Sequence, residues 1–130
     1  MGLNEKRKMK ELQEVTFPGR VNEIAEICGA PISYEVDWAS LAESYDALNF
    51  IDNISCHRLN MALRAICLDD LGKSAVRDGL KLVKLKNVAD KAAMQITFAG
   101  GVLEMHCAYA MGAEGMFSDN EIRQILEKGL

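Results

Sequence analysis

Two histidines and four cysteines are the residues of this chain best suited to bind a metal or act as nucleophile and base. Each histidine has a cysteine as its direct neighbour: Cys56 precedes His57, and His106 precedes Cys107. A zinc site needs about four such side chains that converge on one point. A catalytic pair needs a thiol within hydrogen-bond reach of an imidazole. The elements that carry the two pairs therefore decide what chemistry they can do.

The segment MQITFAGGVLEMHC predicts a β-hairpin over residues 94–107. Gly100 and Gly101 separate two alternating runs, which is typical of a two-residue hairpin turn. Counting outward from the turn gives these cross-strand pairs: Phe98–Leu103, Ile96–Met105, Met94–Cys107, Thr97–Glu104 and Gln95–His106. Since neighbouring strand residues point to opposite faces, we expect Cys107 in the core and His106 outside, beside Glu104.

Residues 41–68 predict a long helix with two apolar sides. The core stripe holds Leu41, Tyr45, Leu48, Cys56, Leu59, Ala62, Leu63 and Ile66. The second stripe holds Phe50, Ile54, Met61, Ala65 and Leu68. Neighbouring helical residues diverge by about 100°, so Cys56 faces the core while His57 joins Arg64 on a polar strip. Because neither Cys/His pair has both members on one face, we expect no zinc site and no Cys-His catalytic pair. Cys56 and Cys107 can still meet each other inside the core.

Asp52 lies in the middle of the core stripe, where an unbroken helix should not place a charge. One interpretation is a break at NFIDN with Asp52 as a helix cap; another is a buried carboxylate with a raised pKa, as in some catalytic acids. Ser40 followed by Glu43 predicts a capping box at the start of this helix.

The remaining elements follow from periodicity and end signals. Helices are expected over 4–15, with Asn4 as cap, over 18–28, ended by Gly29, over 69–79, and over 118–129, with a capping box of Ser118 and Glu121. Strands are expected over 32–38, with Trp38 on the apolar face, and over 80–88, with a bulge. The lysines at 81–86 can face the acids of the earlier strand.

Length and composition indicate a single domain over residues 1–130, because 49% of the 130 residues are hydrophobic and 26% are charged. The net charge of −4 argues against nucleic-acid binding, and residues 21–57 carry seven acids and no Lys or Arg. No apolar run is long enough to cross a membrane, and no signal peptide is recognised, so we expect a cytoplasmic protein with reduced thiols.

The expected fold is α+β, with about four antiparallel strands and helices packed on one face.

Three functions remain open. The first, which we favour, is a non-enzymatic protein-binding module. It would form a homodimer through the second stripe or bind a basic partner through its acidic first half, as an immunity or inhibitor protein does. The second is a small-molecule binding domain with its pocket between sheet and helix. The third is an enzyme using Asp52, Glu104 or His106. Ligand-binding candidates are Asp52, His57, Arg64, Glu104 and His106. No cofactor or metal is expected.

Overall fold

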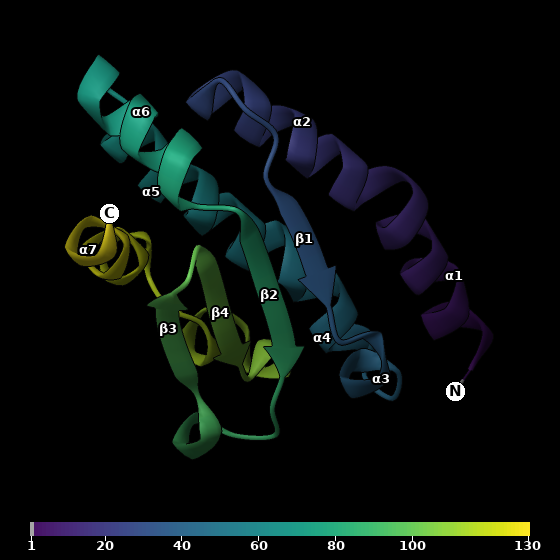
Figure 1. Ribbon diagram of the computed structural model, residues 1–130. Coiled ribbons are helices and arrows are strands. Elements are labelled where there is room, and N and C mark those ends of the chain that lie inside the picture. The colour runs from purple at the N-terminus through teal and green to yellow at the C-terminus, as the bar shows by residue number, and fades with distance from the viewer. Residues whose placement is uncertain (1) are drawn as a thin grey trace.

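The computed structural model describes residues 2–130 and contains one four-stranded sheet in the order β1-β2-β4-β3 (Figure 1). The strands are β1 (Ser33–Val36), β2 (Leu82–Asn87), β3 (Gln95–Ala99) and β4 (Val102–Cys107). The α+β class and the four strands are confirmed. The strand directions differ from the expectation, because β1–β2 and β2–β4 pair in parallel and only β3–β4 is antiparallel. Helices between β1 and β2 return the chain to the same end of the sheet, which makes a parallel pair.

The hairpin forms as predicted. Gly100 and Gly101 have φ values of 59° and 81°, the positive values that a tight turn of this kind requires. The expected register is confirmed from Gln95–His106 to Phe98–Leu103. Met94 precedes the first residue of β3, so its expected pair with Cys107 is outside the ladder. The predicted contact between a lysine of β2 and an acid of β1 also forms, with Lys84 Nζ 3.7 Å from a Glu35 carboxylate oxygen.

The N-terminal helix is one continuous element where two helices were expected. It consists of α1 (Leu3–Glu11), a π-helical segment η1 (Leu12–Thr16) and α2 (Phe17–Cys28). Its N-cap is Gly2, so the expected cap at Asn4 is wrong. Pro18 does not end the helix: it lies in the first turn of α2, directly after the wider π-helical turns, where its missing N–H is tolerated. Gly29 ends the helix with φ 82°, as predicted.

The central helix runs without a break from Tyr45 to Ile66, as α4 (Tyr45–Phe50), π-helical η2 (Ile51–Cys56) and α5 (His57–Ile66). The predicted break near Asp52 is wrong, since this residue lies inside η2. The capping box at Ser40 is wrong as well. Ser44 caps α4 by accepting a hydrogen bond from Ala47 N at 3.1 Å.

The residues expected to end the first strand form a separate short helix, α3 (Trp38–Leu41). Asp37 caps it by accepting a hydrogen bond from Ser40 N at 3.2 Å. The hydroxyl of Ser40 is engaged elsewhere, because it accepts a hydrogen bond from Asn87 N at the end of β2. Trp38 therefore leaves the strand and packs edge-on against Phe17 of α2.

The core lies between one face of the sheet and the helices. Buried side chains alternate along β2 and β4: Val83, Leu85, Leu103, Met105 and Cys107. In Figure 1, α4 and α5 run behind the sheet and no helix passes in front of β2 or β4. The chain is completed by α6 (Asp70–Gly79), the short helices η3 (Lys91–Ala93) and η4 (Tyr109–Gly115), and α7 (Asp119–Gly129), which carries the predicted capping box of Ser118 and Glu121.

The second apolar stripe of the central helix is covered over only part of its length. Phe50 and Ile54 are half-buried, and the α4 segment packs against η4 as well as α1. Both η4 and the N-terminal α1 therefore cover this part of the stripe. Beyond this part, Met61 is 41% exposed, Ala65 is exposed and Leu68 is 85% exposed. The uncovered part of the stripe is therefore its C-terminal half.

Candidate functional site

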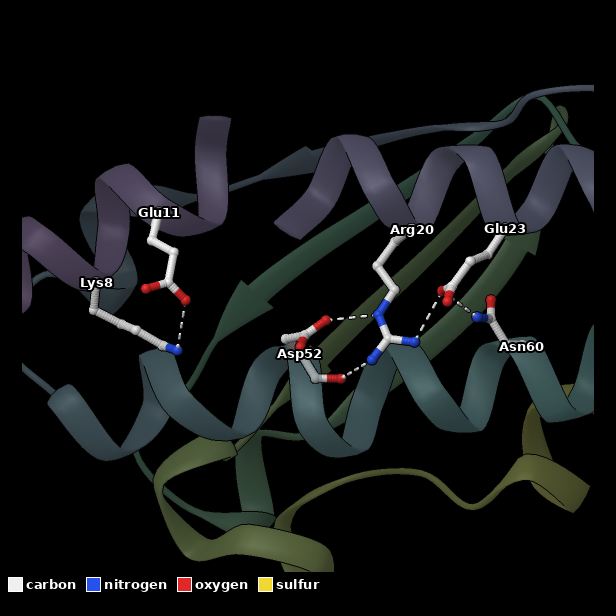
Figure 2. A network of polar contacts seen from close by, with 6 residues as sticks. All are labelled: Lys8, Glu11, Arg20, Glu23, Asp52 and Asn60. Atoms are coloured by element: carbon white, nitrogen blue, oxygen red, sulfur yellow. Dashed lines mark hydrogen bonds and ion pairs between the residues drawn. The ribbon is translucent and has the colours of Figure 1, made fainter. Parts of the chain in front are cut away.

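Asp52 is held in a polar network between the two long helices (Figure 2). Arg20 on α2 donates from Nε to Asp52 Oδ1 at 2.6 Å, and from a terminal nitrogen to the Asp52 backbone oxygen at 3.3 Å. Its other terminal nitrogen donates to Glu23 Oε1 at 3.0 Å, and Asn60 Nδ2 donates to the same oxygen at 3.0 Å. The network joins α2 to η2 and α5.

The side chains of Arg20 and Asp52 are 18% and 16% exposed, so both are largely removed from water. Burial alone would lower the pKa of Arg20, but the hydrogen bond and the charge of Asp52 outweigh it and raise that pKa. Asp52 is thus the counter-ion of a guanidinium. This arrangement favours a structural role for Asp52 over that of a catalytic acid, because the carboxylate faces a fixed partner instead of a cavity.

Cys56 and Cys107 lie deep in the core and apart from the two imidazoles. Burial raises the pKa of Cys56 to about 12 and that of Cys107 to about 11. His57 is exposed on α5, and His106 lies on the opposite face of β4 from Cys107. The thiols that meet are instead Cys28 and Cys67, with sulfurs 3.3 Å apart. Within residues 2–130, no group of three or more His, Cys, Asp or Glu side chains is arranged to hold a metal ion.

The uncovered face of the sheet, here called the open face, brings Glu104 and His106 together. His106 Nε2 lies 2.6 Å from Glu104 Oε2. Glu104 is in register with Lys84, which is in register with Glu35, so acids flank a lysine across three strands. Lys86 is in register with His106. A shallow pocket of about 330 Å³ on this face is lined by Glu35, Val36, Asp37, Lys84, Leu85, Lys86 and Glu104, and His106 is not part of its lining.

The open face carries charged side chains of both signs. Lys84 Nζ lies 3.7 Å from a Glu35 carboxylate oxygen, and the His106 ring is held against Glu104. A histidine oriented by a carboxylate can accept a proton from a substrate. The residues that line this pocket include no Ser, Thr or Cys to serve as nucleophile. His57 and Arg64, both on α5, are not among the residues that line this pocket.

An apolar surface at the junction of α5, α6 and α7 was only half predicted. Leu68 and Leu71 are 85% and 80% exposed. Beside them is a groove of about 450 Å³ lined by Ala65, Ile66, Asp69, Leu71, Gly72, Ala75, Glu127 and Leu130. We call Leu68, Leu71 and this groove the leucine corner.

Leu71 is the residue of the leucine corner that sequence reasoning missed, although a signal for it exists. Asp69 accepts a hydrogen bond from Gly72 N at 2.7 Å and so fixes the start of α6. Leu71 and Val76 are five residues apart on α6, so their side chains point about 140° apart around the helix axis. Val76 is fully buried. An apolar residue on the far side of a short capped helix must face solvent or a partner.

Comparison with known proteins assigns no relative: no family model, curated protein or solved structure matches this chain. None of the helices in the described part of the chain is long and apolar enough to cross a membrane. The case for a function therefore rests on the two surfaces described above, the open face and the leucine corner.

Proposed function

We propose that this protein is a protein-binding module that forms a two-fold homodimer through the leucine corner. The observation that carries the proposal is the pair of leucines, Leu68 and Leu71, that stand 85% and 80% exposed beside an apolar groove. Burying one leucine side chain is worth about 1.5–3 kcal/mol, so leaving two of them in water side by side is costly. Contiguous apolar surface of this kind marks an interaction site.

The leucine corner fits a second copy of the chain because it contains both a protrusion and a groove. In a two-fold contact the same surface serves both partners, so Leu68 of each copy can enter the groove of the other. The charges also suit this arrangement. The charged residues that line the groove are Asp69 and Glu127, and Arg64 lies four residues before Leu68 in the last turn of α5. A dimer would thus bring a cation of each copy toward acids of the other.

This proposal retains the cytoplasmic location expected from the sequence, and the four free cysteines support it. It also keeps the C-terminal half of the predicted stripe, Met61, Ala65 and Leu68, as part of the interface. The sequence predicts a basic partner protein at the acidic first half of the chain. The leucine corner is a second place for such a partner, because Asp69 and Glu127 line its groove. Small-molecule binding in the open-face pocket is a second candidate function, favoured by the convergence of Lys84, Lys86 and Glu104 there.

The test is the molar mass in solution, measured by sedimentation velocity and light scattering at high micromolar concentration. We expect twice the chain mass of 14.4 kDa for the wild-type protein. Leu68→Glu should give a folded monomer, because the side chain is exposed in the chain alone and in the dimer would carry a negative charge into a groove lined by Asp69 and Glu127. Met61→Glu should weaken the dimer. The matched control is Val15→Glu, also exposed (67%) but located on η1, which should leave the dimer intact.

A wild-type monomer at high micromolar concentration contradicts the homodimer. An unchanged dimer in Leu68→Glu places the interface elsewhere and contradicts the role of the leucine corner. If the wild-type protein is a monomer that binds a basic protein through Leu68, the partner at the leucine corner is that basic protein and not a second copy of the chain.

A further inference from the structure

Cys28 and Cys67 are brought into contact from distant parts of the chain. Cys28 is the last residue of α2, and Cys67 follows the last residue of α5, 39 positions later. Their sulfurs are 3.3 Å apart, which is thiol–thiol contact without a covalent bond. A disulfide bond requires about 2.05 Å, so the sulfurs need to approach by little more than an ångström.

Both cysteines lie where the backbone can supply that movement. Cys28 is followed by Gly29, whose φ of 82° ends the helix. Cys67 is followed by a turn, residues 67–69, that connects α5 to α6. Neither cysteine is held in the middle of a helix, in contrast to Cys56, or in a strand, in contrast to Cys107. A small shift at two helix ends can close the bond without repacking the core.

The four cysteines also differ in what their sulfurs meet. The hydroxyl of Tyr34 lies near the thiol of Cys56, and that of Tyr109 near Cys107. Only Cys28 and Cys67 meet another thiol among the described residues. Cys67 is also the least buried of the four, at 6% exposure, and its neighbour Leu68 is 85% exposed. Cys67 is therefore the thiol of the pair closer to the surface, and a reagent would approach it from the turn at residues 67–69.

We propose that Cys28 and Cys67 form an oxidisable dithiol, a redox modification site that a small-molecule disulfide such as oxidised glutathione converts to an intramolecular disulfide. The Cys67 thiolate attacks one sulfur of the reagent, whose S–S bond breaks and releases one glutathione thiolate. The Cys28 thiolate then attacks the Cys67 sulfur of the mixed disulfide and releases the second. The protein loses two electrons and two protons, and the reagent gains both to become two glutathione thiols.

Oxidation would tie the end of α2 to the junction of α5 and α6. In the reduced protein α2 packs against both α5 and α6 without a covalent bond between them. Because the disulfide closes a loop of this length in the unfolded chain, we expect the oxidised protein to melt higher, by on the order of 10 °C. Burial raises the pKa of the Cys28 thiol to about 12, so the second attack should be slow at neutral pH, over minutes to hours.

The experiment equilibrates the folded protein in glutathione buffers of increasing oxidising strength. Samples are quenched in acid, unfolded, alkylated and measured by intact mass and peptide mapping. We expect two alkyl groups in place of four, with about 2 Da lost before alkylation and one bridged peptide pair containing Cys28 and Cys67. Melting curves with and without reductant give the shift in Tm.

Single substitutions identify the pair and the order of attack. Cys56→Ala and Cys107→Ala should keep the bridge, since neither sulfur belongs to it. Cys67→Ser should abolish it. Cys28→Ser should stop the reaction at a mixed disulfide on Cys67, visible as one glutathione adduct. If a variant fails to fold, the peptide map of the wild-type protein still decides.

Two results would overturn the proposal. One is four alkylatable thiols in the most oxidising buffer, while the protein stays folded. The other is a bridge that includes Cys56 or Cys107. Wild-type protein oxidised in denaturant serves as the control, because a random chain should give mixed pairings. The proposed dimer would cover the turn at residues 67–69, so the reaction is also run on the Leu68→Glu variant. The bridge should form in this monomer at least as fast as in the wild-type protein, and a monomer that keeps four alkylatable thiols overturns the proposal whether or not the dimer exists.

Discussion

The polar network between the long helices predicts an asymmetry between two substitutions at one ion pair. Arg20→Ala removes the cation and leaves two carboxylates, those of Asp52 and Glu23, without their guanidinium partner. Asp52→Ala leaves Arg20 in place, still paired with Glu23 at 3.0 Å. Removing the arginine should therefore cost more free energy of unfolding than removing the aspartate.

The magnitude follows from burial. Exposed ion pairs are worth about 0.2–1 kcal/mol, and breaking a fully buried pair costs about 3–5 kcal/mol. Arg20 and Asp52 keep 18% and 16% of their side-chain exposure, so solvent screening reduces the upper figure. We expect about 3 kcal/mol for Arg20→Ala, about 1–2 kcal/mol for Asp52→Ala, and a coupling of about 1–2 kcal/mol between them in the double variant.

The assay is urea unfolding of the four proteins at one fixed protein concentration, because any self-association contributes to the measured stability. Figure 2 also shows the control, the pair of Lys8 and Glu11 at 3.4 Å on the first helix. Glu11 is 58% exposed, so a cycle on this pair should give a coupling below about 0.5 kcal/mol. The reasoning is refuted if Asp52→Ala costs more than Arg20→Ala, or if the buried pair couples no more strongly than the control.

Two further predictions concern the hairpin and the buried thiols. Gly100→Ala and Gly101→Ala both place a side chain on a backbone with positive φ. A Cβ at Gly100 meets open space, whereas a Cβ at Gly101 lies 3.3 Å from a backbone oxygen. Thermal unfolding should show a loss of stability of about 1 kcal/mol for Gly100→Ala and up to about 3 kcal/mol for Gly101→Ala, and equal losses would contradict the turn geometry. Stability should fall as pH rises above about 9, because burial raises the pKa of Cys28 and Cys56 to about 12 and of Cys107 to about 11, and the unfolded chain releases those protons first. The contribution of these buried thiols to the free energy of unfolding is fully present below about pH 9 and is lost as the pH rises toward their folded-state pKa values. Urea midpoints that stay unchanged from pH 8 to about 10.5 would contradict the burial of these groups.

Local signals predicted the elements whose geometry is decided within a few residues. The hairpin register, the helix end at Gly29 and the capping box of Ser118 and Glu121 all depend on neighbours in sequence. Each involves one turn of backbone and one or two hydrogen bonds, which the residue types specify by themselves. Such features could be predicted without knowing where the rest of the chain lies.

The errors arose where a distant residue decides between local alternatives. Ser40 and Ser44 are both acceptable helix caps by type. Ser44 caps the central helix because the Ser40 hydroxyl is taken by Asn87, 47 residues away at the end of β2. The parallel strand directions have the same origin, since they depend on how helices between β1 and β2 pack and not on the strands themselves.

Asp52 shows how far such a case can be taken from sequence. The cost of burying a carboxylate in an apolar stripe can be avoided in three ways: by a break in the helix, by protonation of the carboxylate, or by a cation from elsewhere in the chain. Residues 21–57 contain no Lys or Arg, so the third solution requires a cation from outside that segment. Arg20 is the residue directly before it, and the structure places it 2.6 Å from Asp52. The acidic composition that suggested a basic partner protein thus also contained the signal for an internal partner, which only the pairing of the two long helices makes visible.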